Sequence, residues 1–229
     1  MNDGPILYRF CTDEDLANVA TSDFVALSHR DQCLARGKDG TVDHLNPWVL
    51  NSASTDFTKI VPGQVVQIEG PRPPFRPPAE CFGVVSTSGN SITLRRRGML
   101  PSAGVPITLA TDLTDVCFSV LTFDPQIARA SIELERRFGV SDFIYGRRTS
   151  DLWDPTELRD ACVLSVLASV YLDASRGTGD RLTGQPDVWG TKSKRYEDLL
   201  MDLLSRVEVH WRNNDALNPP ARRSMRLSR

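Results

Sequence analysis

Hydrophobic and polar positions divide the chain into three zones. Residues 1–22 are mostly polar and hold one short apolar face. Between residues 23 and 123, apolar and polar residues alternate in short runs, which is the two-residue period of half-buried strands. From residue 124 to residue 206, apolar residues recur every three or four positions, which is the period of amphipathic helices. The chain is therefore expected to fold as an α+β protein with a β-rich middle.

The β-rich zone is expected to form several short strands. They cover residues 23–27, 47–50, 63–68, 83–86, 91–94 and 117–123. The segment Ser88-Gly89-Asn90 separates two of them and suits a tight hairpin turn. Strands this short, separated by Gly- and Pro-rich loops, favour a small antiparallel barrel or sandwich.

Three expected helices begin at capping residues. Thr12 is an N-cap for a short helix, and Asp124 with the proline after it begins a second helix that stops at Gly139. Asp154 and Glu157 form a capping box at the start of a third helix. Because this third helix is apolar on most of its circumference, we expect it to be the buried centre of the helical part.

A fourth helix is expected to begin near residue 192, after a loop at residues 176–190. Its apolar residues recur at intervals of three and four, which gives a stripe along one side. The stripe is formed by Tyr196, Leu199, Leu200, Leu203, Leu204 and Val207. We expect it to pack on the third helix, with the acidic residues of the fourth helix outside.

Composition limits the classes of function. The net charge of −2 gives no global attraction to nucleic acid or to an acidic membrane. Five scattered cysteines without Cys-x-x-Cys spacing are no disulfide framework and indicate a reducing compartment, and Cys162 is expected to be a small core residue. The N-terminus lacks the features of a signal peptide, and no apolar run is long enough to cross a bilayer. We therefore expect a cytosolic protein that leaves the cytosol only as part of a particle.

Catalytic motifs are missing from the sequence. The spacings typical of phosphate-binding loops, dinucleotide-binding loops, zinc proteases and serine hydrolases do not occur. His29 and Cys33 lie four residues apart, but no second pair completes a four-ligand metal site. The acidic run at residues 13–15 is explained by the dipole at a helix N-terminus. We therefore expect no enzyme, and no catalytic residues, metal site or cofactor.

The arginine run after one expected strand is a candidate contact site. Arg95, Arg96 and Arg97 either contact phosphates or protect a strand edge and contact a protein. The second alternative is favoured, because acidic residues elsewhere cancel an extended basic field. The proline-rich loop at residues 70–78 is either a stiff excursion or an arm that reaches a partner.

The C-terminal tail at residues 212–229 is the strongest functional signal. Its prolines forbid a helix, and its arginines are interspersed with isolated apolar residues, so the tail cannot fold alone. It is either a disordered basic end or a segment that becomes ordered on a partner. The candidate partner-binding residues are Pro219, Pro220, Arg222, Arg223, Met225, Arg226, Leu227 and Arg229.

Several segments resemble the head–tail adaptor proteins of tailed bacteriophages, also called connector or head-completion proteins. The segments are YRFCTDEDL at residues 8–16, ERRFG at 135–139, the long apolar helix that follows, SKRYE at 193–197, and VEVHWR at 207–212 with the Arg-rich tail. In that family a small helical bundle forms a ring, usually twelvefold, under the portal. The resemblance implies a bundle of three to four helices at residues 1–22 and 124–211, an inserted β-domain at residues 23–123 and an extended tail at residues 212–229.

The resemblance also implies a location and partners. It implies a structural protein of the virion neck, assembled in the host cytoplasm, that surrounds the DNA channel and contacts no membrane. Its partners would be further copies of itself, a tail terminator or stopper protein, and the portal protein, which residues 219–229 would contact. The arginines at residues 95–97 would line the lumen near packaged DNA or contact a neighbouring subunit.

Other functions stay open at this point. The chain could be another ring component of a phage-like tail or injection machine, although such rings have a mostly β core. It could also be a small DNA-binding regulator, which would bind DNA with a strong salt dependence. An unrecognised enzyme would need a pocket with perturbed titratable groups.

Overall fold

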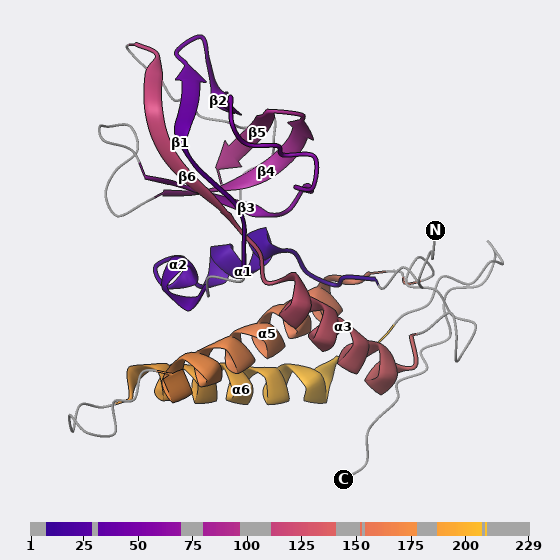
Figure 1. Cartoon of the computed structure of the whole chain (residues 1–229). Helices are drawn as coiled ribbons and strands as arrows, with labels where there is room; N and C mark the ends of the chain where they lie inside the picture. Colours follow the sequence, from indigo (N-terminus) through magenta and orange to yellow (C-terminus); the bar gives the residue numbers. More distant parts are fainter. Residues whose placement is uncertain are drawn as a thin grey trace, which may run out of the picture. The chain divides into compact units, whose positions relative to one another are not determined.

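The chain divides into two compact units (Figure 1). The computed structural model describes residues 8–28, 32–69, 80–96, 111–140, 152, 154–177, 187–207 and 209. The barrel unit is Thr12–Phe123, and the helical unit consists of Met1–Cys11 and Asp124–Arg229. The α+β class expected from the sequence is confirmed. The boundary between the units falls at Thr12 rather than at residue 23, because the first helix packs against strands of the barrel unit.

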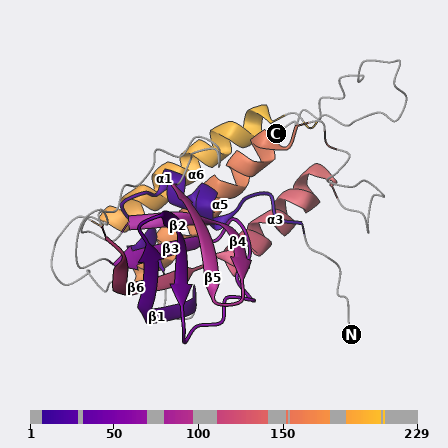
Figure 2. The same ribbon diagram turned by 90° about the horizontal axis from the view of Figure 1, so that it is seen from above.

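Six antiparallel strands close into a barrel (Figure 2). The strands are β1 (Cys33–Asp43), β2 (Asn46–Ser52), β3 (Val65–Glu69), β4 (Glu80–Ser88), β5 (Ser91–Arg96) and β6 (Leu113–Leu121). Their order around the barrel is β1-β2-β5-β4-β3-β6, and β1 pairs with both β2 and β6, which closes the ring. Of the two β architectures expected, the barrel is therefore the one formed. The expected hairpin is confirmed between β4 and β5, where Ser88 pairs with Ser91.

Apolar side chains fill the barrel. The core consists of Val42, Leu50, Phe57, Ile60, Val66, Ile68, Phe82, Val84, Ile92, Leu94, Val116, Phe118 and Val120. On β5 the buried residues alternate with half-buried ones, which is the period that the sequence pattern predicts for this strand. The rings of Phe57 and Phe118 meet in this core, with their centroids 5.6 Å apart.

Strand β1 was not expected from the sequence, although it is the longest strand described. Polar residues and two glycines give it the appearance of a loop. The glycines are required by packing, because a Cβ on Gly37 would lie only 2.4 Å from the Phe118 ring, and a Cβ on Gly40 would lie 2.7 Å from the Val116 carbonyl oxygen. The pairing of β1 with β6 also shifts register between these two glycines.

The expected strand at residues 23–27 is wrong, because this segment forms the helix α2 (Phe24–Leu27). It follows α1 (Asp13–Val19) closely, and the Phe24 N–H donates to the Ala20 carbonyl at 2.8 Å. Phe24 and Leu27 are both buried, and the Phe24 ring meets the Phe123 ring edge-on at 5.1 Å. A run of five residues is too short for its periodicity to distinguish a helix from a strand.

The helical unit contains the helices α3 (Asp124–Phe138), α5 (Thr156–Gly177) and α6 (Val188–Arg206). The expected ends of α3 are confirmed, and Gly139 after it has a φ of +64° that favours glycine. At the start of α5, the Asp154 carboxylate accepts a hydrogen bond from the Thr156 N–H at 2.8 Å. Cys162 is fully buried on α5, as expected.

Helix α6 begins four residues earlier than the sequence indicated, at Val188 instead of residue 192. Asp187 caps it by accepting a hydrogen bond from the Gly190 N–H at 2.8 Å. Gly190 had indicated a loop, but it is needed inside the first turn, because a Cβ there would lie 2.2 Å from the Asp187 carboxylate.

Helix α5 packs against both α3 and α6, and it runs beside α6 in both views (Figures 1 and 2). The buried Tyr171 of α5 is the main aromatic contact to α6: its ring stacks on Tyr196 at 5.4 Å and lies 5.6 Å from Trp189. The Lys192 ammonium lies over the Tyr171 ring at 5.6 Å. The Ser193 hydroxyl donates to the Ala168 carbonyl at 2.8 Å, which fixes the register of the two helices.

Three segments that the sequence singled out lie outside the described residues. They are the proline-rich loop at residues 70–78, Arg97, and the tail at residues 212–229. Within the described ranges, the helices are too short or too polar to cross a membrane.

We expect Tyr171→Ala to lower the free energy of unfolding by about 3–5 kcal/mol, the usual cost of deleting a buried aromatic side chain. The neighbouring Leu172→Ala is the matched control, because Leu172 is 40% exposed and should cost about 1 kcal/mol or less. Urea unfolding of both variants, followed by circular dichroism, measures the difference. Equal losses would contradict the central place of Tyr171 in the α5–α6 contact.

Candidate functional site

The acidic first turn of α1 joins this helix to the barrel. The Asp13 carboxylate is buried and accepts hydrogen bonds from the Phe123 N–H at 2.6 Å and from the Thr122 hydroxyl at 2.8 Å. Asp15 and Thr12 form a capping box, in which the Thr12 N–H donates to the Asp15 carboxylate at 2.9 Å. The sequence explained these acids by the helix dipole alone, but each of the three carboxylates also bonds specific groups.

The third carboxylate of the turn, Glu14, forms an ion pair with Arg95 of β5. The Arg95 Nε lies 3.0 Å from each Glu14 carboxylate oxygen, and the Arg95 Nη2 also donates to this carboxylate. The Glu14 side chain is only 5% exposed, so the pair is shielded from water on the side of the acid. The hydrogen bond to Glu14 raises the pKa of Arg95, against the effect of burial.

Gly83 of β4 makes room for this ion pair. It lies directly opposite Arg95 in the β4–β5 pairing. A Cβ on Gly83 would lie 2.6–2.7 Å from the carboxylate atoms of Glu14. The close approach of Glu14 to the sheet therefore requires glycine at this position.

The structure places the two described arginines of the run at residues 95–97 in different surroundings. Arg95 directs its Nε and Nη2 to the Glu14 carboxylate. Arg96 is half-buried, and its Nε is buried without a hydrogen-bond acceptor among the described residues. Arg97 lies outside these residues. The ion pair with Glu14 gives the positive charge of Arg95 a structural role within the barrel unit.

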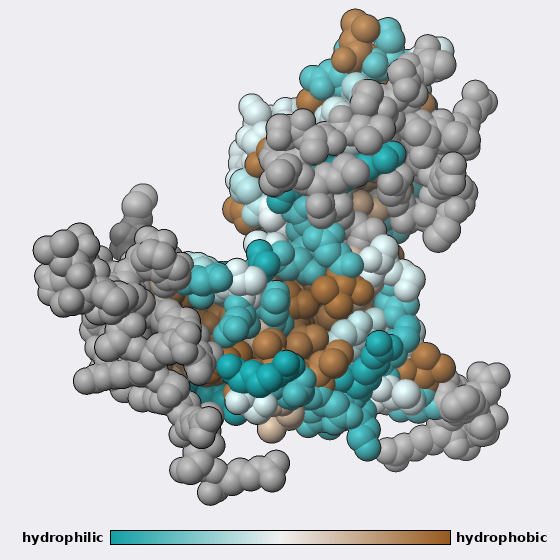
Figure 3. Space-filling view, turned by 180° about the vertical axis from the view of Figure 1, so that it is seen from behind, coloured by the Kyte–Doolittle hydropathy of each residue, from teal (hydrophilic) through white to brown (hydrophobic). Residues whose placement is uncertain are grey.

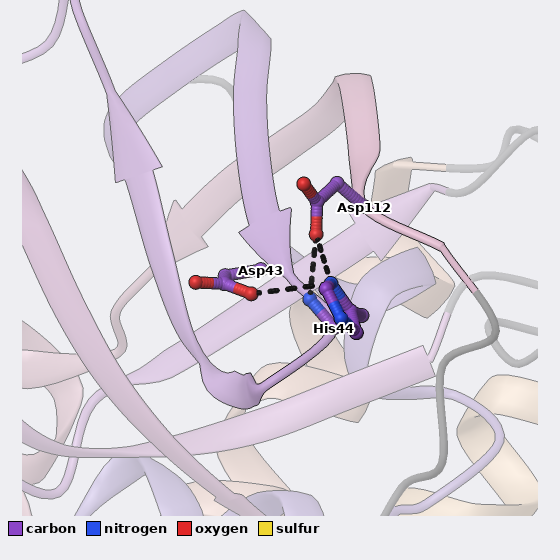
Figure 4. Close-up of side chains that lie close together, drawn as sticks. All are labelled: Asp43, His44 and Asp112. Carbon is purple, nitrogen blue, oxygen red and sulfur yellow. Dashed lines mark hydrogen bonds and ion pairs between the residues drawn. The ribbon is translucent and has the colours of Figure 1, made fainter.

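A second polar cluster lies at the turn between β1 and β2 (Figure 4). The Asp112 carboxylate oxygen accepts from the backbone N–H of His44 at 2.9 Å and lies 2.6 Å from the ring Nδ1 of His44. An Asp43 oxygen lies 3.5 Å from the same ring nitrogen. The hydrogen bond to Asp112 raises the pKa of His44, and the His44 backbone N–H and ring lower the pKa of Asp112.

Within the described part of the chain, these three residues are the group whose atoms are placed so that they could hold a metal ion. Asp43, His44 and Asp112 each offer one ligand atom, and the three atoms lie within 4.8 Å of one another. All three residues are exposed, and their hydrogen bonds account for the arrangement without a cation. The sequence did not indicate the cluster, because Asp112 lies 68 residues after His44 and no local spacing connects them.

Exposed apolar side chains are the remaining candidate for a functional surface (Figure 3). The expected stripe of α6 is only partly covered: Leu204 and Val207 are buried, whereas Leu199 is 44% exposed. Val188 lies eleven residues before Leu199, which is about three helical turns, so both are on the same flank of α6. Val188 is also exposed. The flank formed by Val188 and Leu199 is called the α6 flank below.

A shallow depression of about 320 Å³ lies between α3 and α5. Serines from α5, Ser165 and Ser169, line one side of it, and the exposed ion pair of Arg129 with Glu133 lines the other. This mixture of small polar and charged side chains suits a contact with a protein better than a pocket for an apolar small molecule.

Comparisons of the chain with protein-family models, with curated proteins and with solved structures find no match.

The candidate tail residues from Pro219 to Arg229 lie outside the described residues. The described site residues are therefore Arg95 and Arg96 from the sequence analysis, and Glu14, Gly83 and the His44 cluster from the structure.

We expect Gly83→Ala to displace Glu14 and to lower the free energy of unfolding by about 1–3 kcal/mol, the cost of leaving a buried polar group without its partner. Glu14→Gln should cost a similar amount. Because both changes break one interaction, the double variant should lose less than the sum of the single losses. Chemical denaturation of the four proteins measures this coupling, and simple additivity would contradict the role of Gly83.

The His44 imidazole is expected to titrate above its ordinary pKa of about 6.5. Its pair with Asp112 should stabilise the folded barrel unit below pH of about 6.5, and this contribution is lost as the pH rises through the raised pKa. At acid pH the contribution is lost as the pH falls through the lowered pKa of Asp112. An NMR titration of the imidazole protons checks the midpoint, which Asp112→Asn should lower and the more distant Asp43→Asn should lower less.

Proposed function

We propose that the chain is a structural virion protein, a head-to-tail adaptor that forms a ring between the portal and the tail or stopper protein. The helical unit makes the contacts between subunits, and the ring surrounds the DNA channel in the neck of the particle. The tail residues 219–229 dock on the portal. The protein contributes no chemistry, because its task is to hold its neighbours in a fixed geometry.

The partly uncovered apolar stripe of α6 is the observation that supports this proposal best. An apolar stripe along one side of a helix normally packs against another part of a protein. Leu204 and Val207 are buried, and the flank with Val188 and Leu199 stays exposed in the isolated chain. A neighbouring copy of the helical unit is the partner that a ring supplies, and its different surface gives a heterologous contact.

The environment of Arg95 weighs against the DNA-binding regulator. A regulator needs arginines that are available to phosphates. Arg95, the first arginine of the run, instead pairs with a carboxylate that is almost completely buried. In the adaptor, the same ion pair holds α1 on the barrel, and DNA needs only to pass through the ring without specific contact.

The test of the proposed function compares three proteins: the full-length chain, the chain without residues 219–229, and Leu199→Lys. Negative-stain microscopy and cosedimentation with capsids that carry a portal but no tail are the measurements. The full-length protein should decorate the capsid vertex with a ring. The truncated protein should lose vertex binding, and Leu199→Lys should weaken ring formation by about tenfold or more, because a charge is then buried between subunits.

Leu45→Lys is the matched control, because Leu45 is an exposed leucine of the barrel unit with 81% of its surface accessible. It should assemble and bind as the unchanged protein does. Normal rings from Leu199→Lys would contradict the assignment of the α6 flank. If no variant binds capsids while the full-length chain shifts DNA in a salt-dependent manner, the regulator replaces the adaptor.

A further inference from the structure

The N-terminal segment of the helical unit lies against α3 and α5. The Phe10 N–H donates to the hydroxyl of Ser131 on α3 at 3.2 Å. The next residue, Cys11, donates its thiol hydrogen to the sulfur of Cys162 on α5, with 3.2 Å between the two sulfur atoms. Both cysteines are buried, and they are 151 residues apart in the sequence. The two thiols therefore meet through the fold and not through local spacing.

The sulfur atoms are close enough to be joined with little movement. The S–S bond of a disulfide is about 2.05 Å long, so the two sulfurs have roughly 1 Å to travel. We propose that Cys11 and Cys162 are a redox modification site, at which a hydroperoxide converts the two thiols into a disulfide. The bond fastens the N-terminal segment to α5, the central helix of the unit.

The surroundings of Cys162 favour it as the nucleophile. The Cys11 thiol donates to its sulfur, and the Ser131 hydroxyl lies 3.6 Å from the same sulfur. Hydrogen-bond donors to a sulfur favour its thiolate, which is the reactive form of cysteine.

The reaction is a two-electron oxidation of the thiols. The Cys162 thiolate attacks one peroxide oxygen, the O–O bond breaks, and the released hydroxide or alkoxide takes up the proton that Cys162 had lost. The Cys162 sulfenic acid then reacts with the Cys11 thiolate: the S–S bond forms, the S–O bond breaks, and the leaving hydroxide takes up the proton from Cys11. With hydrogen peroxide, two thiols and one peroxide give one disulfide and two waters.

The other three cysteines are less suited to this reaction. Cys33, Cys81 and Cys117 lie on β1, β4 and β6 of the barrel unit. Their partners on the neighbouring strands are Leu121, Gln67 and Glu69 respectively, so the described sheet register pairs none of them with another cysteine. Selective bridging of Cys11 with Cys162 is therefore expected, and it does not depend on the adaptor proposal.

Peptide mapping of the oxidised full-length protein tests the inference. The reduced protein is freed of reductant, treated with a small excess of hydrogen peroxide, unfolded in an alkylating reagent and digested. We expect the intact chain to lose two hydrogen atoms, and one peptide pair to be joined through Cys11 and Cys162 until reductant is added. The thermal unfolding midpoint of the helical unit should rise by roughly 5–10 °C, because the bridge closes a long loop in the unfolded chain.

Variants separate this site from general thiol oxidation. Cys33→Ser and Cys117→Ser should form the bridge as the unchanged protein does. Cys11→Ser should instead accumulate the sulfenic acid on Cys162, which a 1,3-dione reagent traps, whereas Cys162→Ser should not accumulate it on Cys11. Alkylation of Cys11 and Cys162 as thiols after peroxide treatment, or bridges from them to barrel cysteines, would overturn the proposal. The map of the unchanged protein decides this even if a variant does not fold.

Discussion

Two buried carboxylates at the start of α1 constrain the whole barrel unit. A buried carboxylate costs several kcal/mol unless it is paired and hydrogen-bonded. Asp13 meets this condition only where the end of β6 presents the Phe123 N–H and the Thr122 hydroxyl, and Glu14 only where β5 presents Arg95. The short helix therefore has one position in which both acids are satisfied. That position exists only with β5 and the end of β6 in their places in the sheet.

This constraint also explains how the unit can interrupt a helical protein. Asp13 lies at the start of the barrel unit in the sequence and accepts hydrogen bonds from Thr122 and Phe123 at its end. The chain therefore enters and leaves this unit at neighbouring points. In the helical unit, Arg9 lies just before the barrel unit in the sequence and Asp124 just after it. These two residues form an ion pair, with 2.7 Å between Nε and Oδ1. In each unit, contacts within that unit hold its two junction segments together. The helical unit can therefore be assembled from segments that lie more than one hundred residues apart. An insertion between such neighbouring ends leaves the packing of both cores intact.

Local signals in the sequence predicted the parts of the fold that depend on local physics. The capping residues and prolines located the starts of α3 and α5, and the turn residues Ser88-Gly89-Asn90 located the hairpin of β4 and β5. Strand β1 could not be predicted, because its glycines are explained by the Phe118 ring and the Val116 carbonyl oxygen of β6, which lie far along the chain. The same holds for the site: the partner of Arg95 lies 81 residues away, and Asp112 lies 68 residues from His44. Nothing in the periodicity of either segment encodes such a contact.

The distribution of exposed apolar residues differs between the two units in a way that bears on assembly. Single exposed apolar residues are normal on protein surfaces and carry no information. In the barrel unit Leu34, Leu45 and Val61 fit this description, because they come from separate strands and turns. Val188 and Leu199 differ, since they share one flank of a helix whose other side is already packed. An apolar stripe wider than one neighbouring helix covers can bury its exposed flank only against a second neighbour, and among the described helices α5 is the one that packs on α6.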